Sequence, residues 1–434
     1  MEQRRVILRD LLSKRPADVA AVLTEISEDQ AIDLVHRLFL RQQAAEPLSE
    51  MEPEDSAEIL ARLDRDEAIK ILSRMDPDDA VDLLEELPVE TQQELLSRLA
   101  DEDAELLSNL LAYPPDSAGG LMSPEFVELT LEMTSGQAID LLRRQIEEAE
   151  TVYYAYITDT DGLLVGVVGL RDMVLAPPDT QLVQILDRDV VSVPVTDDVE
   201  DVARLFDKYS FIALPVVEEG GKLLGIITVD DVIDVIREEA TEDIYGLAAV
   251  PREEGVDTRW GSSFRMRLPW MYVRLATGLA AAVVVGLFED MVAKVAALAV
   301  LMGVVAGQGG SAGMQTVTIM TRGIALGDID RDKGFRLLGK EALLGMVNGL
   351  IVGLTVGLIT YIWKGDLLLG VAMLGAMTLT LTAAGAAGAL IPLLVRALGK
   401  DPALASGIFL TTITDVFGYA VLFILAWLLL PELS

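Results

Sequence analysis

From about residue 266 onward, long apolar runs alternate with short charged segments. Four runs contain no charged side chain apart from one aspartate, and they span 295–321, 342–363, 367–395 and 402–431. Each is longer than the ~20 residues that an α-helix needs to cross the hydrocarbon core of a bilayer. A fifth apolar segment extends from about 268 to 288 and includes Arg274, with Trp270 and Tyr272 placed to lie at the membrane interface. The pattern therefore predicts five membrane-spanning helices.

Asp415 is the one charged side chain inside the last apolar run. A carboxylate at membrane depth is costly unless it faces protein or water, so we interpret Asp415 as a functional-site residue. Thr411 lies one helical turn before it and Gly418 and Tyr419 one turn after, which gives the helix a polar face typical of an ion-path wall. The alternative is a structural aspartate paired with a helix cap or a hydroxyl group. Arg322, at a predicted helix end, is the nearest candidate counter-ion.

Small and polar residues recur at helical spacing in two other runs. Glycine returns every fourth residue in the run 342–363, at Gly345, Gly349, Gly353 and Gly357, as in tightly packed membrane helices. The run 295–321 carries a polar stripe composed of Gln308, Ser311, Gln315 and Thr318. A water-lined path and polar contacts between helices both explain such a stripe.

Basic residues concentrate on one side of the predicted bundle. They are Arg265, Arg267, Arg322, Arg331, Lys333, Arg336, Lys340, Arg396 and Lys400, whereas the other connections carry Lys294 and Lys364. The positive-inside rule then places the N-terminal half in the cytoplasm and the C-terminus outside the cell membrane. The first ten residues lack the apolar region of a secretory signal, so we expect none.

The balance of acidic and basic residues changes near residue 265, where the long apolar runs begin. Up to Arg265 there are 23 Lys+Arg against 59 Asp+Glu, and after it 11 against 10. Cysteine is absent, which excludes thiolate sites, and the one histidine, His36, lies in a polar stretch expected at the surface. Metal sites must therefore use oxygen ligands, which favours Mg²⁺, Ca²⁺ or Mn²⁺. The net charge of −35 repels phosphate, so we expect no nucleic-acid partner.

The acidic half begins with a twelve-residue repeat. Its marker positions are Met51, Leu63, Met75, Leu87, Leu99 and Leu111. Pro53, Pro77 and Pro88 stand where the first turn of a helix tolerates proline. This pattern predicts stacked short helices, a small all-α superhelix. We expect most of its carboxylates to face water.

Residues 119–245 contain two copies of an α/β unit. Strands are expected at 153–158, 163–168, 212–217 and 223–228, and the turns 159–162 and 218–221 join them in pairs. Gly166 and Asp172 in the first copy recur as Gly225 and Asp231 in the second, at equal separation. The pattern predicts a tandem α/β domain.

The two copies, with 214–217 followed by 225–231, resemble a tandem of CBS (cystathionine-β-synthase-type) domains. Together with the segments 118–124, 239–244 and 401–404 leading to 414–416, the whole chain resembles the MgtE family of magnesium channels or transporters. The resemblance implies a multi-domain membrane protein. Its expected parts are an acidic N-terminal superhelix at 1–118, CBS domains at 119–182 and 183–245, a connecting helix from about Val229 toward Phe264 (its continuation at 246–265), and a five-helix transmembrane domain at 266–434.

The resemblance also implies a homodimer in the lipid bilayer that takes up Mg²⁺ and is not an enzyme. Its Mg²⁺-selective pore would lie on the dimer axis, where Asp415 of each subunit holds a hydrated ion. Cytosolic Mg²⁺ would close the pore by bridging acidic sensor residues, at the positions Glu58, Asp78, Asp82, Asp198, Glu200, Asp231, Asp234, Glu239, Glu242 and Asp243. An adenine nucleotide such as ATP would bind at Tyr154, Arg171, Asp172 and Phe211.

The chain departs from the family pattern at three places. Asparagines expected near 309–315 are absent, 406–407 reads Ser-Gly instead of Asn-Pro, and Ser210 replaces an acidic residue. Ion selectivity and sensor affinity therefore do not follow from the resemblance. A secondary transporter of Co²⁺ or Mn²⁺, regulated by nucleotide at its CBS domains, is the alternative function. An intramembrane enzyme would need a second acid near Asp415, which a dimer alone supplies, and a membrane-anchored sensor leaves the polar faces unexplained.

Overall fold

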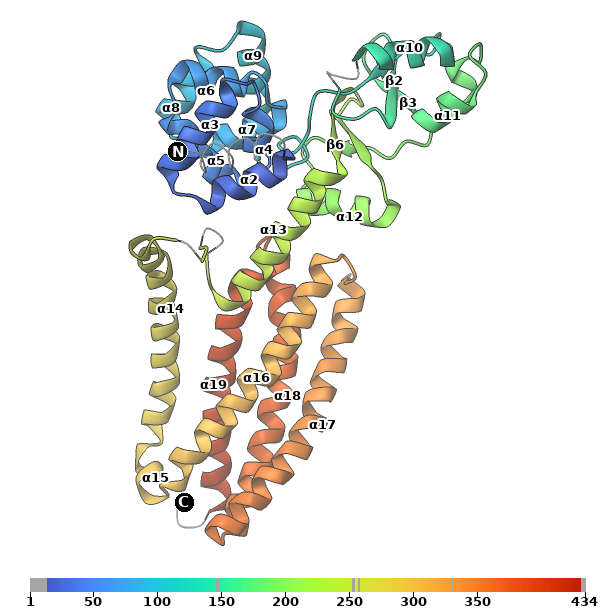
Figure 1. The fold of residues 1–434 in the computed structure, drawn as a ribbon. Helices are drawn as coiled ribbons and strands as arrows, with labels where there is room; N and C mark the ends of the chain where they lie inside the picture. Colours follow the sequence, from blue (N-terminus) through green and yellow to red (C-terminus); the bar gives the residue numbers. More distant parts are fainter. Residues whose placement is uncertain (1–13, 146–148, 252–253, 257, 330, 431–434) are drawn as a thin grey trace. The chain divides into compact units, whose positions relative to one another are not determined.

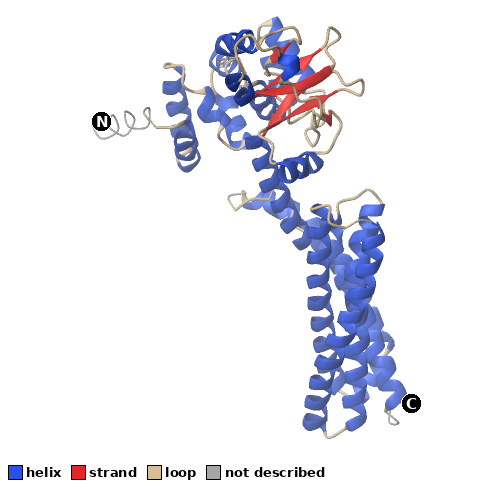
Figure 2. Ribbon diagram, turned by 90° about the vertical axis from the view of Figure 1, so that its right-hand side faces the viewer, coloured by secondary structure: helices blue, strands red, loops and turns tan. Residues whose placement is uncertain are grey.

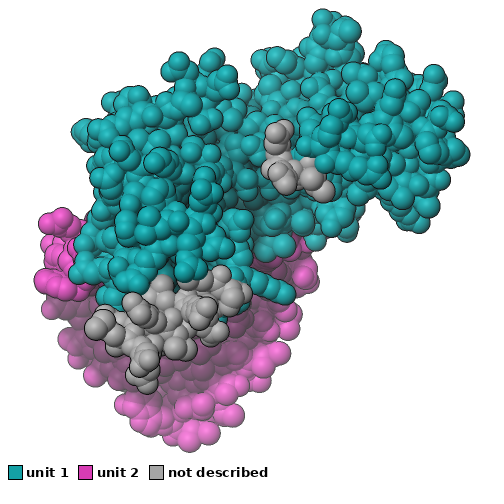
Figure 3. Space-filling model, turned by 45° about the horizontal axis from the view of Figure 1, so that its top comes forward, with its two compact units in different colours: residues 1–236 teal, residues 237–434 magenta. Residues whose placement is uncertain are grey.

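The computed structural model describes residues 14–145, 149–251, 254–256, 258–329 and 331–430 (Figure 1). It divides into two compact units, residues 1–236 and 237–434 (Figure 3). Strands occur in the first unit, and the described part of the second is helical (Figure 2).

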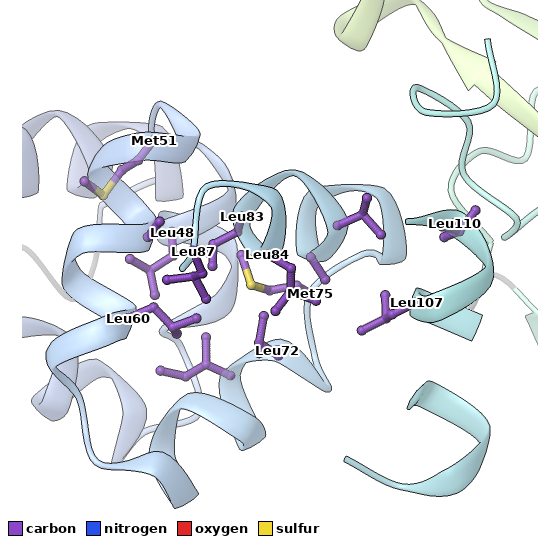
Figure 4. Packing of buried hydrophobic residues seen from close by; sticks show 14 of the residues in the cluster. Leu48, Met51, Leu60, Leu72, Met75, Leu83, Leu84, Leu87, Leu107 and Leu110 are labelled. Atoms are coloured by element: carbon purple, nitrogen blue, oxygen red, sulfur yellow. The ribbon is translucent and has the colours of Figure 1, made fainter. Parts of the chain in front are cut away.

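The N-terminal part of the first unit is a stack of short helices. These are α2 (Pro16–Glu25), α3 (Glu28–Phe39), α4 (Ala45–Ser49), α5 (Pro53–Arg62), α6 (Arg65–Leu72), α7 (Pro77–Glu85), α8 (Val89–Leu96) and α9 (Asp101–Leu110). The first five repeat markers are buried just before successive helices, and Leu111 packs partly buried against the same core. Figure 4 shows three of these markers, Met51, Met75 and Leu87, among the buried residues. The predicted superhelix is confirmed. The Nδ1 atom of His36 lies 2.8 Å from Oε1 of Glu67 at the surface, so this histidine is a surface residue as expected.

Two three-stranded sheets follow. The first has the order β1 (Glu128–Leu129), β2 (Tyr154–Thr158), β3 (Leu164–Gly169), and the second β4 (Val193–Pro194), β5 (Ala213–Val217), β6 (Leu223–Thr228). In each sheet the first strand pairs in parallel and the last two form a hairpin. Around them lie α10 (Ser135–Gln145), α11 (Leu170–Leu175), the 3₁₀ turn η1 (Leu182–Gln184) and α12 (Val199–Tyr209). The four predicted strands are confirmed. The strands β1 and β4, of two residues each, were not predicted, because so short a segment gives no strand pattern.

The two hairpins join at their turns. The backbone N–H of Leu164 donates to the carbonyl of Gly221 at 3.0 Å, and that of Leu223 donates to Gly162 at 3.1 Å. Gly162 and Gly221 have φ values of 78° and 83°, a conformation that favours glycine, so these turn residues allow the two sheets to meet.

The connecting helix α13 spans Val229–Ala248. The prediction that it continues toward Phe264 is wrong. Ala249 has a φ of 55°, and Pro251 two residues later has no N–H to continue the helical hydrogen bonds. Trp260 to Phe264 instead begin the next helix.

Five helices in the second unit are long and apolar enough to cross a membrane, as predicted. They are α14 (Trp260–Leu287), α16 (Ala297–Ala325), α17 (Arg331–Lys364), α18 (Leu367–Ala397) and α19 (Pro402–Leu429). A short helix, α15 (Glu289–Lys294), lies between the first two and was not predicted. Helix α18 packs against α16, α17 and α19, whereas α14 stands apart and packs against α19 (Figure 1).

The glycine row of α17 lies against α18. A Cβ atom at Gly345 would lie 2.3 Å from the carbonyl oxygen of Leu381, and one at Gly357 would lie 2.6 Å from that of Gly370. Because real Cβ contacts are never this short, the row is needed for close helix packing, the interpretation that the four-residue spacing favours.

Candidate ion path and acidic sites

Asp415 lies half-buried on α19, next to the face that this helix turns into the bundle. Thr414 and Gly418 form part of that inner face: a Cβ atom at Gly418 would lie 3.3 Å from Thr380 of α18. Thr411 and Tyr419 flank Asp415 at one-turn spacing and are also half-buried. The carboxylate is therefore neither enclosed in the apolar core nor fully directed at lipid, a position compatible with the wall of an ion path.

Arg274 of α14 is the residue whose positive charge acts on Asp415. The expectation that Arg322 would be its counter-ion is wrong, because the charge of Arg322 acts on Asp243 at the end of α13. Arg274 and Thr411 line the same cavity between α14 and α19. The first membrane helix thus contributes to the surroundings of the last one.

The polar stripe is exposed in the single chain. Gln308, Ser311, Gln315 and Thr318 are all exposed, and the last three line an open groove along α16. Exposed amide and hydroxyl groups at membrane depth are costly in contact with lipid. Water or a second protein surface must therefore cover this groove.

Carboxylates from three parts of the first unit form an acidic cluster, composed of Asp76, Asp78, Asp79, Glu150, Asp230 and Asp231. Asp78 is buried, Asp79, Glu150 and Asp231 are half-buried, and Asp76 and Asp230 are exposed. Asp78 on α7 is 9% exposed, and its Oδ1 atom has no hydrogen-bond partner among the described residues. Burial, with the charges of Asp231, Glu150 and Asp79, raises the pKa of Asp78 well above its ordinary value. The cluster therefore concentrates negative charge that would be relieved by a bound cation.

Glu150 and Asp231 show the same effect. Burial, followed by the charges of Asp76 and Asp231, raises the pKa of Glu150 to about 8. Burial also raises the pKa of Asp231 to about 6, although its Oδ2 atom accepts a hydrogen bond of 2.6 Å from the hydroxyl of Thr228. The charges acting on Asp78 and Glu150 are all negative.

No group of three His, Asp or Glu side chains within the described residues is arranged to chelate a metal ion directly. Mg²⁺ retains several water molecules and needs only one or two carboxylates. The acidic cluster therefore fits a hydrated divalent ion better than an ion bound by several side chains.

A second acidic pair lies where α13 meets the transmembrane bundle. Burial raises the pKa of Asp243 above its ordinary value, the charge of Asp401 raises it further, and that of Arg322 lowers it. Asp401 caps α19 by accepting from the N–H of Ala403 at 2.8 Å, while its Oδ2 atom is buried without a partner among the described residues. This carboxyl pair places negative charge at the start of the helix that carries Asp415.

Comparisons with known proteins agree with this organisation. Residues 302–425 match the family model MgtE, described as a divalent cation transporter. Residues 14–116 match the MgtE intracellular N domain, and 182–238 match the CBS domain. The chain is 40% identical over 326 residues to the magnesium transporter MgtE of Enterococcus faecalis, covering 75% of this chain and 72% of the relative. The chain belongs to the MgtE family. It is also 40% identical over 324 residues to the magnesium transporter MgtE of Thermus thermophilus, covering 74% and 72% of the two chains.

A solved structure gives the same result for the soluble part. The cytosolic domain of the Mg²⁺ channel MgtE in complex with ATP has a TM-score of 0.51 and 38% identity to this chain, covering 54% of it and 94% of the solved chain. MgtE membership makes this chain a divalent cation transporter and not an enzyme, with a helical N-terminal domain, CBS strands and five membrane helices. Its N-terminal and CBS domains are cytoplasmic.

The positions expected from the MgtE resemblance to sense Mg²⁺ differ in their surroundings. The structure brings Asp78 and Asp231 into one acidic cluster, whereas Glu58, Asp82 and Asp234 are exposed. Asp198 caps α12 by accepting from the N–H of Glu200 at 2.9 Å, and the Oε2 atom of Glu200 lies 3.5 Å from Arg204. These last two side chains thus have local structural roles. Glu239, Glu242 and Asp243 are half-buried on α13.

Several carboxylates were missed from the sequence. The doublets 78–79 and 230–231 gave a signal for Asp79 and Asp230, because neighbouring acids lie within one helical turn of each other. Glu150 gave none, because folding alone brings it to its acidic partners. Asp401 begins the segment 401–404 on which the resemblance rests, but nothing in the sequence indicates that Asp243 is its partner.

The four residues expected to bind nucleotide come from both CBS copies. Tyr154 pairs with Gly169 across the first hairpin, and Arg171 and Asp172 follow on α11, so these three gather at one end of the first sheet. Phe211 precedes β5 in the second copy, where it stacks on Tyr209 with ring centroids 5.3 Å apart. A site using all four would therefore span both copies.

Proposed function

We propose that the chain is a Mg²⁺-selective, Mg²⁺-gated channel or transporter for magnesium uptake. The observation that carries the proposal is the half-buried Asp415 on the last membrane helix, with hydroxyl side chains one turn away on either side. Its relatives named magnesium transporters support the choice of ion. The transporter acts as a homodimer with its C-terminus outside the cell, so that two Asp415 side chains face each other on the dimer axis.

The physical basis of conduction is attraction without full dehydration. Mg²⁺ sheds its water reluctantly, so carboxylate oxygens would contact the hydrated ion through its water shell. Two aspartates attract a divalent ion about twice as strongly as a monovalent one at equal distance, since Coulomb energy scales with charge. The exposed polar stripe of α16 supplies further oxygen and nitrogen groups to the same wet path.

Gating rests on the acidic cluster. Without a cation, Asp78, Glu150 and Asp231 repel one another and favour separation of the segments that carry them. Cytosolic Mg²⁺ would bind between them, favour the compact arrangement and, through α13, close the pore. A ligand shifts this equilibrium only by its difference in affinity for the two states, and hydrated binding by few carboxylates suits a millimolar sensor.

The transport proposal is tested in proteoliposomes. Mg²⁺ uptake should fall to background in Asp415→Asn and Asp415→Ala, because either change removes the charge that attracts the ion. Asp290→Asn, which neutralises an exposed carboxylate of α15, is the matched control and should transport normally. Normal uptake by both Asp415 variants would exclude the proposed path.

The gating proposal has a separate test. The double change Asp78→Ala with Asp82→Ala should leave Mg²⁺ uptake intact but weaken its inhibition by Mg²⁺ on the cytoplasmic side. Changing the exposed pair Asp101 and Glu102 on α9 to alanine keeps the loss of charge equal and should leave inhibition unaltered. Equal inhibition in the two double variants would argue against the acidic cluster as a sensor.

A secondary transporter of Co²⁺ or Mn²⁺, regulated by nucleotide, is the second candidate. Its support is the ATP bound by the solved relative and the clustering of Tyr154, Arg171 and Asp172. Channel currents reverse at the equilibrium potential of the ion, whereas coupled transport does not, so reversal potentials for each divalent ion separate the two candidates. ATP binding that is lost in Asp172→Ala would support the nucleotide site under either one.

A further inference from the structure

Glu341 is a buried carboxylate inside the transmembrane unit that the transport mechanism above does not use. It lies on α17 just before the apolar run and is 6% exposed. Its Oε2 atom accepts a hydrogen bond of 3.2 Å from the hydroxyl of Thr316 on α16, which is also 6% exposed. Its Oε1 atom lies 3.5 Å from Nζ of Lys340, whose side chain reaches outward.

Helix α18 makes room for this pair with two glycines. A Cβ atom at Gly385 would lie 2.5 Å from the carbonyl oxygen of Glu341, and one at Gly388 would lie 2.8 Å from Cβ of Thr316. Three helices therefore converge on one polar contact, and a larger residue at either glycine would force them apart.

The contact between Glu341 and Thr316 matters because the hydrophobic effect does not fix how a helix is rotated about its axis in lipid. Lipid tails are as apolar as leucine, so the rotation of α16 about its axis depends on packing and on specific hydrogen bonds. Gln315 of the polar stripe directly precedes Thr316, and consecutive helical residues lie about 100° apart around the axis. Holding Thr316 inward thus keeps Gln315 outward, where it is exposed and lines the groove.

We propose that Glu341 is a positioning residue: through its hydrogen bond with Thr316 it fixes the rotation of α16 and so directs the polar stripe toward the ion path. The rotational part stands on the described contacts alone. The link to ion conduction rests on the proposed function.

The absence of cysteine from the chain allows a direct test of this rotation. Single cysteines at Gln315, which is exposed, and Val317, which is fully buried, are labelled with a water-soluble thiol reagent in proteoliposomes. The ratio of the two labelling rates reports which face of α16 is accessible. Each cysteine is combined with Glu341→Leu, Glu341→Gln, Thr316→Val or Thr321→Val, and Mg²⁺ uptake is measured in parallel.

Thr321→Val is the matched control, because Thr321 is a buried threonine on the same helix whose hydroxyl has no partner among the described residues. Glu341→Leu and Thr316→Val should each lower the labelling ratio about threefold or more, the range expected for one hydrogen bond between membrane helices. Glu341→Gln keeps an acceptor oxygen and should preserve the ratio. Thr316→Val nearly preserves side-chain shape, so its result stands even if Glu341→Leu fails to fold.

An unchanged ratio in Thr316→Val, or an equal fall in Thr321→Val, would overturn the proposal. A lower labelling ratio together with normal Mg²⁺ uptake would overturn the link between the rotation of α16 and the ion path. The two proposals can be refuted independently. Normal uptake by the Asp415 variants would refute the ion path but not the rotation of α16, and an unaltered labelling ratio would refute the role of Glu341 but not that of Asp415.

Discussion

Asp415 of the last membrane helix is electrostatically coupled to Arg274 of the first. Both side chains belong to helices that pack against each other, and Arg274 shares a cavity with Thr411, one turn before Asp415. In a single chain the positive charge of Arg274 therefore already acts on the candidate ion-binding carboxylate. An incoming ion must compete with Arg274 for Asp415, which a divalent ion does better than a monovalent one.

Replacing Arg274 with glutamine should therefore strengthen cation binding at Asp415. We expect the Mg²⁺ concentration for half-maximal uptake to fall about tenfold, because an opposite charge near a partly buried group is weakly screened. Uptake of K⁺, measured in the same proteoliposomes, should rise. Arg265→Gln removes an exposed arginine nearer the start of the same helix, α14, and should change neither value. Identical uptake curves for the two variants would show that Arg274 does not neutralise Asp415.

The acidic cluster predicts a stability that falls with pH when divalent ions are absent. The pKa of Glu150 rises from 4.5 to about 8 on folding and that of Asp231 from 3.8 to about 6. The folded protein therefore holds protons that the unfolded chain has lost, and the free energy of unfolding decreases as pH rises from about 4 to 8. Above about pH 6 the remaining slope should come largely from Glu150.

The midpoint of thermal unfolding, measured in EDTA between pH 5 and pH 8, checks this prediction. Glu150→Gln should flatten the decrease above pH 6, and Mg²⁺ should raise the midpoint more at pH 8 than at pH 5. Glu132→Gln changes an exposed carboxylate of the same domain and should keep the full slope. A slope that is the same in both variants would contradict the assignment of the proton to Glu150.

The glycine row predicts a local packing defect. Gly345→Ala should lower the free energy of unfolding of the transmembrane unit by about 1–3 kcal/mol, because its Cβ atom would meet the backbone of α18. Gly339→Ala on the same helix adds a Cβ atom with no neighbour within 4 Å. It should be neutral or stabilising by up to ~1 kcal/mol, since alanine favours helix. Unfolding in detergent distinguishes the two, and equal midpoints would refute the packing role.

Hydropathy alone predicted most of the architecture. Helices that cross a bilayer must satisfy their backbone internally and face lipid, so five long apolar runs were enough to locate α14, α16, α17, α18 and α19. The strand-like apolar runs and the twelve-residue repeat were equally direct. The end of α13 was misplaced although Pro251, which cannot continue the helical hydrogen bonds, follows Ala248 by three positions. The positive φ of Ala249 itself leaves no signal in the sequence.

The candidate site was predictable where one residue contrasts with its neighbours. Asp415 was found because a charge interrupts an apolar run. Three other residues act on groups that lie far away in the sequence. The charge of Arg274 acts on Asp415 of α19, Glu150 belongs to the acidic cluster, and Glu341 accepts a hydrogen bond from Thr316. Their roles depend on which helices and loops pack together, and periodicity along one segment does not specify that.

Asp78 offers the sharpest test of how the acidic cluster responds to Mg²⁺. Its carboxylate is buried beside other carboxylates with one oxygen unpartnered among the described residues, so Asp78→Asn keeps the shape and removes the repulsion. At pH 8 without divalent ions, the variant should be more stable, because the neutral amide is not repelled by Asp231, Glu150 and Asp79. The stabilisation added by Mg²⁺ should shrink, because a ligand stabilises only in proportion to its preference for the folded state. Asp55→Asn, at an exposed position of α5, should leave both quantities unaltered. Thermal unfolding with and without Mg²⁺ measures them, and an undiminished Mg²⁺ effect in Asp78→Asn would mean that the ion binds elsewhere.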